Sequence, residues 1–314
     1  MAISPYPVDP QLTGLAIAYR NDTYIADMIA PYRPVTKRIF EWDEFTFGEM
    51  FSIPDTSVGR LSKPNQVTFS ASRKQDSTVD YALDSPVPQE DIDNADTNYN
   101  PKNIATEGVM ELIKLDREKR VADRVFASAT YLSTLRTTLS GTSQWSDKTN
   151  SDPITAIRTA MDLAFMRPNK FVMGQAVWTQ LSTHPRILSA ISISGTDKGI
   201  ATREAVASLF EIPVGNLIVG QGYANSAKEG QSVSLIRLWG KHFSMFYENA
   251  AAQLRGTTTA PTFMLSARFG TPISGSIPDP DIGMKGGERV RSGESVKEVV
   301  QSNLSAYFFQ NAVA

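Results

Sequence analysis

The feature that most constrains the fold is a long segment, residues 101–135, that contains no proline after its first residue. Asn100 suits the capping position of a helix, and Pro101 suits the first helical position, where the missing N–H has no intrahelical acceptor anyway. Apolar side chains recur at helical spacing along one face, namely Leu112, Leu115, Ala122, Val125, Phe126, Ala129 and Leu132. The segment predicts one helix on the order of 50 Å long, which is long for a globular core and indicates a spine.

The run KLDREKRVADR inside this segment places opposite charges four residues apart, the spacing of neighbours on a helix surface. Lys114 precedes Glu118 by this interval, and Asp116 precedes Arg120. The run therefore predicts a solvated helix face and no nucleic-acid-binding patch.

Residues 67–83 alternate between apolar and polar side chains and predict a β-hairpin whose connection is the polar stretch 73–77. The apolar positions of the two strands include Val67, Phe69, Val79, Tyr81 and Leu83. A two-stranded hairpin is marginally stable by itself. This one therefore needs a surface to lie on, either within the subunit or on a neighbouring subunit.

The first 50 residues combine several prolines, which interrupt regular elements, with aromatic side chains such as Trp42, Phe45 and Phe47. Such a segment is too apolar for a free tail and predicts an extended arm. Packing on its own domain and packing on a neighbouring subunit both fit this composition.

After a Gly-, Ser- and Thr-rich stretch near residues 140–150, short helices alternate with short strands and predict a compact α+β domain. Strands are expected at 171–174, 216–220 and 262–269, helices at 175–191 and 201–212, and a further hairpin from 232–239 with 242–248. Residues 270–285 are rich in Pro, Gly and Asp and predict a hinge or crossover. The last segment fits a helix and a strand equally well.

Composition excludes several classes of function. The chain has 314 residues, of which 31 are Lys or Arg and 33 are Asp or Glu, and this balance argues against a dedicated nucleic-acid binder. With no Cys and two His, the chain offers no disulfide, no thiolate metal site and no multi-His site. It shows no signal peptide and no apolar stretch of the roughly 20 residues that span a bilayer. We expect a soluble protein made in a cytoplasm, with no membrane partner.

The sequence also lacks recognisable catalytic motifs. Residues 220–222 read Gly-Gln-Gly but lack the third glycine of a dinucleotide-binding turn, so a turn between strands is the better interpretation. His184 is interpreted as a surface or helix-capping residue, and His242 as a packing residue. The acidic run 90–96 lacks the spacing of a calcium-binding loop. We predict no catalytic, cofactor-binding or metal-binding residue.

The order of these parts resembles that of a known family along essentially the whole chain. An apolar arm, a protruding hairpin, a spine helix, a compact domain and a C-terminal return to the spine follow one another. The stretches VTFSASRKQDSTVDYALDSPVPQEDIDNAD, DPITAIRTAMDLAFMRPNKFVMGQAVWTQLSTHPRI and SVKEVVQSNLSAYFFQNAVA are similar to segments of the major capsid (coat) proteins of tailed bacteriophages, which have the Hong Kong 97-type capsid fold. None of these stretches is an invariant motif.

The resemblance implies an α+β fold with four parts. Residues 1–50 would be the N-terminal arm, and residues 51–90 the extended loop, with its hairpin at 67–83, lying over an adjacent subunit. Residues 91–145 with 271–314 would form the peripheral domain around the spine helix, and residues 146–270 the compact axial domain. The expected contacts between subunits are Val67, Phe69, Val79, Tyr81, Leu83, Trp42, Phe45 and Phe47.

The implied function is structural. The protein would assemble with itself, through pentamers and hexamers, into the icosahedral head of a phage virion inside the bacterial host cytoplasm. It would enclose double-stranded DNA by weak, non-specific contact. Because the arm begins within a few residues of Met1, no N-terminal scaffolding segment is expected. The partners would then include a separate scaffolding protein, a portal and a decoration protein.

Two other interpretations stay open. An encapsulin-type nanocompartment shell shares the fold and encloses cargo proteins, although the long hairpin and the arm favour the phage interpretation. A soluble enzyme built on residues 150–270 would instead use His184 near a cleft.

Overall fold

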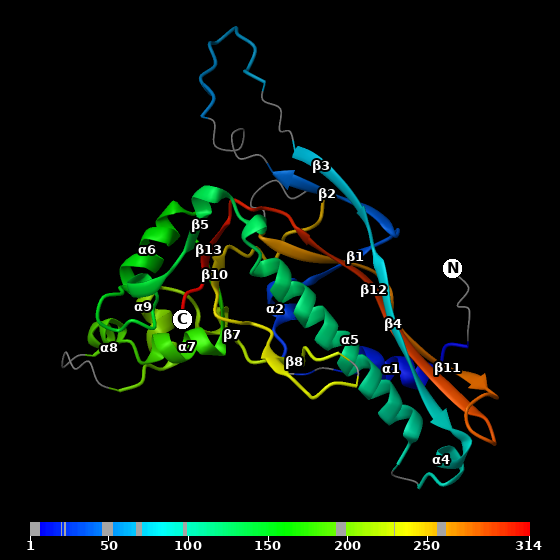
Figure 1. The fold of residues 1–314 in the computed structure, drawn as a ribbon. Coiled ribbons are helices and arrows are strands. Elements are labelled where there is room, and N and C mark those ends of the chain that lie inside the picture. The colour runs from blue at the N-terminus through cyan, green and yellow to red at the C-terminus, as the bar shows by residue number, and fades with distance from the viewer. Residues whose placement is uncertain are drawn as a thin grey trace.

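The computed structural model describes residues 7–19, 21, 23–45, 53–66, 71–96, 99–192, 199–228, 230–255 and 262–314. Its longest helix, α5 (Pro101–Val125), runs diagonally across the molecule (Figure 1). Asn100 caps this helix as predicted, because its side chain accepts hydrogen bonds from the backbone nitrogens of Lys102 and Asn103. The spine helix therefore exists and begins where the sequence places it.

The spine helix ends at Val125, well before residue 135, so its predicted length was too great. Side chains of the following turn bond its last carbonyl groups. The Thr130 hydroxyl donates to the carbonyl oxygen of Arg124 at 2.7 Å, and the Tyr131 hydroxyl donates to that of Val125 at 2.7 Å. Carbonyl groups satisfied in this way do not need another helical turn. The helix is roughly 38 Å long.

The buried face of the spine helix also differs in part from the prediction. Ala122 and Val125 are buried as expected, but Leu112 is 54% exposed. The burial is centred on Val109, Met110, Ile113, Arg117, Glu118 and Val121. The prediction was wrong here because Arg117 and Glu118 occupy the buried face, whereas hydrophobic periodicity assigns charged residues to solvent.

The spine helix packs on a four-stranded sheet with the order β1–β11–β12–β4. These strands are β1 (Tyr32–Val35), β4 (Val79–Pro88), β11 (Met264–Asp279) and β12 (Gly287–Val300). The antiparallel pair β11–β12 is long and extends along the spine helix, from Lys102, which pairs with Glu288, to Arg120, which pairs with Glu298 (Figure 1). The hinge expected at 270–285 is wrong for most of that range, because β11 continues to Asp279 with a register shift between Phe269 and Ile273.

Residues 67–83 do not form the predicted hairpin. β3 (Ala71–Ser77) pairs with β2 (Ile39–Phe45), whereas β4 pairs with β12 and leads into α4 (Gln89–Asp93). The polar stretch 73–77 thus lies inside a strand. It looked like a turn because its charges have partners far away in sequence, such as the ion pair at 3.1 Å between Asp76 and Lys297.

A second, five-stranded sheet carries the compact part of the molecule, in the order β5–β13–β10–β6–β7. Its strands are β5 (Arg136–Thr138), β6 (Lys170–Gly174), β7 (Leu217–Gly220), β10 (Phe243–Phe246) and β13 (Ala306–Gln310). The helices of this part are α6 (Pro153–Leu163), α7 (Gln175–Ser182), α8 (Pro185–Ile191) and α9 (Arg203–Leu209), which lie around the sheet (Figure 1). The predicted α+β fold class is confirmed.

The strand pairing within this part departs from the prediction for one hairpin. The hairpin expected from 232–248 is wrong, because β9 (Leu235–Arg237) pairs with β8 (Tyr223–Asn225), while β10 pairs with β6 and β13. The C-terminal segment forms strands, and β13 joins the compact sheet. Phe309 packs in the core of that sheet, whereas Phe308 packs with Val121 and Val125 of the spine helix. β13 therefore connects the two cores.

The described part of the N-terminal arm packs on its own subunit. It contains α1 (Pro10–Ala18), which lies against β11 and the spine helix, and α2 (Ala26–Ile29), which precedes β1. Leu12, Ala16 and Ile29 are buried there. Of the two placements left open by the composition, packing on the same domain holds for this segment.

A substitution of Gly220, at the end of β7, tests how closely the two cores pack against each other. A Cβ atom on Gly220 would lie 2.1 Å from Cδ1 of Trp239. We expect Gly220→Ala to lower the free energy of unfolding by about 1–3 kcal/mol, the usual cost of overpacking, as measured by urea unfolding. Gly215→Ala is the matched control, because a Cβ there would meet no atom within 4 Å. Equal losses in the two variants would contradict the prediction.

Candidate assembly interface

Two consecutive charged residues of the spine helix, Arg117 and Glu118, are 1% and 0% exposed. Glu118 accepts hydrogen bonds from the backbone nitrogens of Ile25 at 2.9 Å and Ala26 at 2.7 Å, and from Trp239 Nε1 at 2.6 Å. The carboxylate thus lies at the N-terminal end of α2, where free N–H groups need acceptors. Burial raises the pKa of Glu118, although these hydrogen bonds act in the opposite direction.

Arg117 binds the other end of the same short helix. Its guanidinium donates to the carbonyl oxygen of Ala30 at 2.9 Å and forms an ion pair with Asp27. It also lies 4.0 Å from the centre of the Tyr32 ring, within the range of a cation–π contact. Two neighbouring buried charges of the spine helix therefore hold residues 25–32 in place.

A third charged residue of the spine helix, Glu111, holds the preceding part of the arm. It accepts hydrogen bonds from the hydroxyls of Tyr19 at 2.6 Å and Tyr24 at 2.5 Å, and from Asn21 Nδ2 at 3.0 Å. The hydrogen bond to Glu111 raises the pKa of Tyr19 to about 12. These contacts hold Tyr19, Asn21 and Tyr24 of the arm against the spine helix of the same chain.

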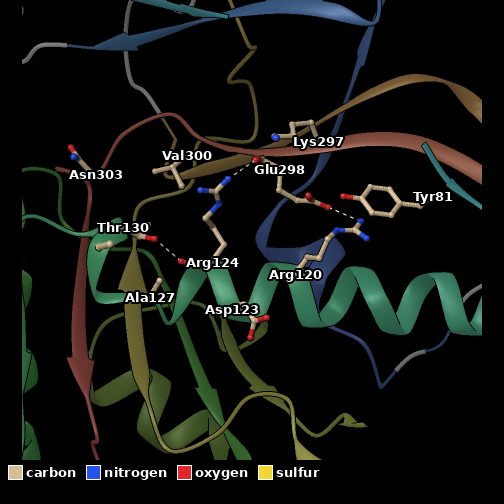
Figure 2. A pocket seen from close by; sticks show the side chains of 11 residues that line it. Tyr81, Arg120, Asp123, Arg124, Ala127, Thr130, Lys297, Glu298, Val300 and Asn303 are labelled. Atoms are coloured by element: carbon tan, nitrogen blue, oxygen red, sulfur yellow. Dashed lines mark hydrogen bonds and ion pairs between the residues drawn. The ribbon is translucent and has the colours of Figure 1, made fainter. Parts of the chain in front are cut away.

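A groove of about 690 Å³ opens where the C-terminal end of the spine helix meets β4 and β12 (Figure 2). The residues that line it include Tyr81, Arg120, Arg124, Thr130, Lys297 and Glu298. We call this feature the arginine groove. No single segment of the sequence contains it, because its lining comes from elements far apart along the chain.

Tyr81, one of the predicted intersubunit contacts, lies at one end of the arginine groove (Figure 2). The guanidinium of Arg120 stands 3.5 Å from the centre of its ring. Arg120 also forms ion pairs with Glu298 at 3.0 Å and with Asp116, its predicted neighbour on the helix. The second predicted neighbour pair is wrong, because Lys114 donates a hydrogen bond to the Tyr32 hydroxyl and not to Glu118.

The other predicted contact residues differ in how the structure places them. Val79 and Leu83 of β4 are 42% and 43% exposed, so they are available to a neighbour. Trp42 is half-buried and its ring centre lies 5.8 Å from that of Phe40. The described side chains do not include Phe45, Phe47, Val67 and Phe69. Their contacts, like those of Val79 and Leu83, stay predictions.

Residues 53–66, which we call the exposed loop, extend away from the body of the molecule at the top of Figure 1. Every residue in this range is exposed, and Ile53 and Leu61 are 98% and 93% exposed. Sequence reasoning missed both residues because isolated apolar positions among polar ones carry no period. Apolar side chains gathered on a protruding segment are typical of a protein–protein contact.

The two histidines have structural roles. His184 is fully buried and caps α8, with its Nδ1 accepting from the backbone nitrogen of Arg186 at 3.3 Å and its Nε2 lying 3.0 Å from Ser151 Oγ. His242 accepts a hydrogen bond from the backbone nitrogen of Asn311 at 2.9 Å. His184 therefore caps a helix, as predicted, and is not placed to act as a base in a cleft.

Metal and membrane sites find no support in the part of the chain that the structure describes. Among these residues, no group of three or more His, Cys, Asp or Glu is placed to hold a metal ion, and this includes the acidic run around α4. No described helix is both long enough and apolar enough to cross a membrane.

The sequence has clear relatives. Residues 128–261 match the family model of phage major capsid protein E. The major capsid protein of Pseudomonas phage JBD67 is 46% identical over 314 residues, which cover 100% of both chains. The chain belongs to the phage major capsid proteins. The major capsid protein of Burkholderia phage BcepMu is 28% identical to this capsid protein over 249 residues, or 76% of each chain.

Solved structures agree on the fold of the capsid protein. A phage-related protein from Bordetella bronchiseptica matches with a TM-score of 0.74 at 20% identity, covering 98% of this chain and 99% of that one. The putative capsid protein of an Escherichia coli CFT073 prophage matches with a TM-score of 0.55 at 12% identity, again covering 98% and 99%. The interpretation as a capsid protein with a Hong Kong 97-type fold is confirmed. Its role is to form the shell of the virion, a structural role, and the encapsulin alternative is not better supported.

The capping of α2 by Glu118 can be tested in this capsid protein. Glu118→Gln keeps the shape of the side chain but turns one acceptor into an amide N–H₂ that faces N–H donors. We expect the free energy of unfolding to fall by on the order of 2 kcal/mol, because hydrogen bonds to charged groups contribute about 1.5–3 kcal/mol each. Urea unfolding of the unassembled subunit measures the change. Glu107→Gln, an exposed acid on the same helix, should leave stability unchanged.

The burial of His184 predicts that the stability of the folded protein depends on pH. Burial lowers the pKa of His184 below its ordinary value of 6.5, so between the two values the unfolded chain binds a proton that the folded protein does not. Its contribution to stability is complete above 6.5 and is lost as the pH falls below that value. His184→Asn keeps a capping side chain and should lose less stability than the original protein between about pH 7 and pH 5. Unfolding midpoints at several pH values measure the slopes, and identical slopes would refute the assignment.

Proposed function

We propose that the exposed loop joins neighbouring subunits of the capsid shell, and that Val79 and Leu83 of β4 extend this contact. The observation that carries the proposal is the exposure of Ile53 at 98% and Leu61 at 93%. Burying a large apolar side chain contributes about 1.5–3 kcal/mol. A neighbour that covers these side chains therefore stabilises the assembly, and each subunit completes its burial only within the shell.

We assign the peripheral domain to the four-stranded sheet with the spine helix, and the axial domain to the five-stranded sheet with its helices. The boundaries expected from the sequence, at 145 and 271, need two changes. β11 begins at Met264 and lies in the four-stranded sheet, so we place residues 264–270 in the peripheral domain. β5 and β13 lie in the five-stranded sheet, so we place both strands in the axial domain. The exposed loop then projects from the peripheral side of the subunit.

The proposed partners of the capsid protein follow from its role as a container. A scaffolding protein, a portal and a decoration protein would act during or after assembly in the host cytoplasm. The packaged double-stranded DNA would touch the inner surface weakly, because the net charge of the chain is −2 and strong phosphate binding needs a basic excess.

The exposed loop can be altered without disturbing the fold. The variant Ile53→Asn with Leu61→Asn removes two side chains that touch no core, so the unfolding midpoint of the subunit should not change. Shell formation should nevertheless fail, or give particles that melt at a lower temperature, because the apolar contact is lost. Electron microscopy and a thermal melt of the particles measure the effect.

Ser62→Asn in the same loop is the matched control, because it leaves both apolar side chains in place. Removing β3 would be a poor test, since β3 pairs with β2 along its whole length and its loss would disturb the subunit. Particles of the double variant that form and melt like the original ones would overturn the role of the exposed loop.

A further inference from the structure

One arginine of the arginine groove, Arg124, has no close carboxylate partner among the described residues. Its charge acts on Asp76 from beyond ion-pair distance and helps to lower the pKa of that carboxyl. Arg120 is paired with Asp116 and Glu298, and Lys297 is paired with Asp76. Arg124, by contrast, forms no ion pair with any carboxylate that the structure describes.

The Arg124 guanidinium donates one long hydrogen bond, of 3.5 Å, to the carbonyl oxygen of Glu298. Figure 2 shows its side chain in the middle of the groove. Asp123, the other acid of the lining, is paired with Lys119. One arginine in an open groove therefore has its donors available for a carboxylate or a phosphate.

An acidic patch lies at the opposite end of the spine helix. Within seven residues, the segment around α4 carries Glu90, Asp91, Asp93 and Asp96, all exposed or nearly so. Lys285 pairs with Glu90 at 3.4 Å. Neither Asp91 nor Asp96 forms an ion pair within the described parts of the chain, so two carboxylates remain available.

These two surfaces do not meet within one subunit. α4 lies beside the N-terminal end of the spine helix, and Arg124 lies in its last turn (Figure 1). The rise of the helix between Pro101 and Arg124 is roughly 35 Å. A contact between the acidic segment and the arginine groove therefore needs two different copies of the chain.

We propose that α4 of one subunit binds in the arginine groove of another, with Asp91 and its acidic neighbours facing Arg124. This inference rests on the proposed function, since it requires copies of the chain to assemble. A contact between different surfaces of identical subunits is heterologous, and such contacts build rings and shells. The exposed loop is a less suitable occupant, because Arg60 and Lys63 outnumber its single acid, Asp55.

Engineered cysteines give a direct test, because the chain contains no Cys of its own. Asp91→Cys is combined with Asn303→Cys, at the rim of the groove, and assembled particles are oxidised and run on a non-reducing gel. A disulfide needs Cα atoms within about 7 Å, so one chain cannot form it with itself. We expect a ladder of covalent oligomers in the double variant and no ladder in either single variant.

The matched control is Glu204→Cys with Asn303→Cys, which moves the first cysteine to an exposed acidic position on α9 and should give no ladder. A third pair, Ile53→Cys with Asn303→Cys, tests the exposed loop as the occupant. Particles without a ladder from Asp91→Cys with Asn303→Cys would overturn the proposal, and a ladder from the loop pair would assign the groove to the loop. A wild-type chain that forms no particles would instead contradict the proposed function.

Charge reversal tests the same contact without cysteines. Arg124→Glu should raise several-fold the subunit concentration needed for assembly, and adding Asp91→Arg should restore it in part. Arg203→Glu, the same charge change on α9, should have no such effect. Assembly of Arg124→Glu at the original subunit concentration would overturn the proposal. A change only in the DNA content of its particles would also overturn it, and would assign the groove to binding of DNA phosphate.

Discussion

The arrangement of the subunit depends on two buried charges, Arg117 and Glu118, in the middle of the spine helix. A buried charge destabilises a protein unless hydrogen bonds compensate its lost hydration. Here the two side chains bond opposite ends of the one-turn helix α2, and Glu118 also accepts a hydrogen bond from Trp239. The same pair thus fixes the arm and the indole that packs against Gly220. The spine helix positions both sheets through contacts that few other arrangements of this chain can satisfy.

This internal fastening separates the described part of the arm, which is held on its own subunit, from the apolar side chains that the subunit leaves exposed. The arm is held on its own subunit by Glu111, Arg117 and Glu118, so it is not the segment that must find a neighbour. The exposed apolar side chains of the described residues include those of the exposed loop and of β4, such as Ile53, Leu61 and Leu83. Covering such apolar side chains when copies of the chain associate would bury further surface and favour assembly.

Local signals in the sequence predicted where helices begin. They did not predict where helices end or which strands pair, because these depend on residues far apart in the sequence. Asn100 caps a helix where the pattern placed it, because a cap depends on neighbouring residues only. His184 also caps a helix, but the single helix expected at 175–191 is wrong, since α7 ends at Ser182 and α8 begins at Pro185. Residues 73–77 looked like a turn because the charge of Asp76 is neutralised by Lys297, more than two hundred positions away. Leu112 was assigned to the core because no periodicity anticipates a buried Arg117. The fold class follows from the order of parts, but the strand pairing does not.

The exposed apolar side chains were predictable only where they follow a period. Alternation identified Val79 and Leu83, both of which the structure leaves exposed, but an isolated side chain such as Leu61 gives no pattern. The arginine groove has no sequence signature, since Arg124 becomes notable only when the carboxylates around it are found to be engaged elsewhere. Its separation from the acidic α4 by the length of a rigid helix has a consequence for growth. The acids of α4 and Arg124 lie too far apart to pair within one subunit, so pairing of these charges favours association with another copy of the chain.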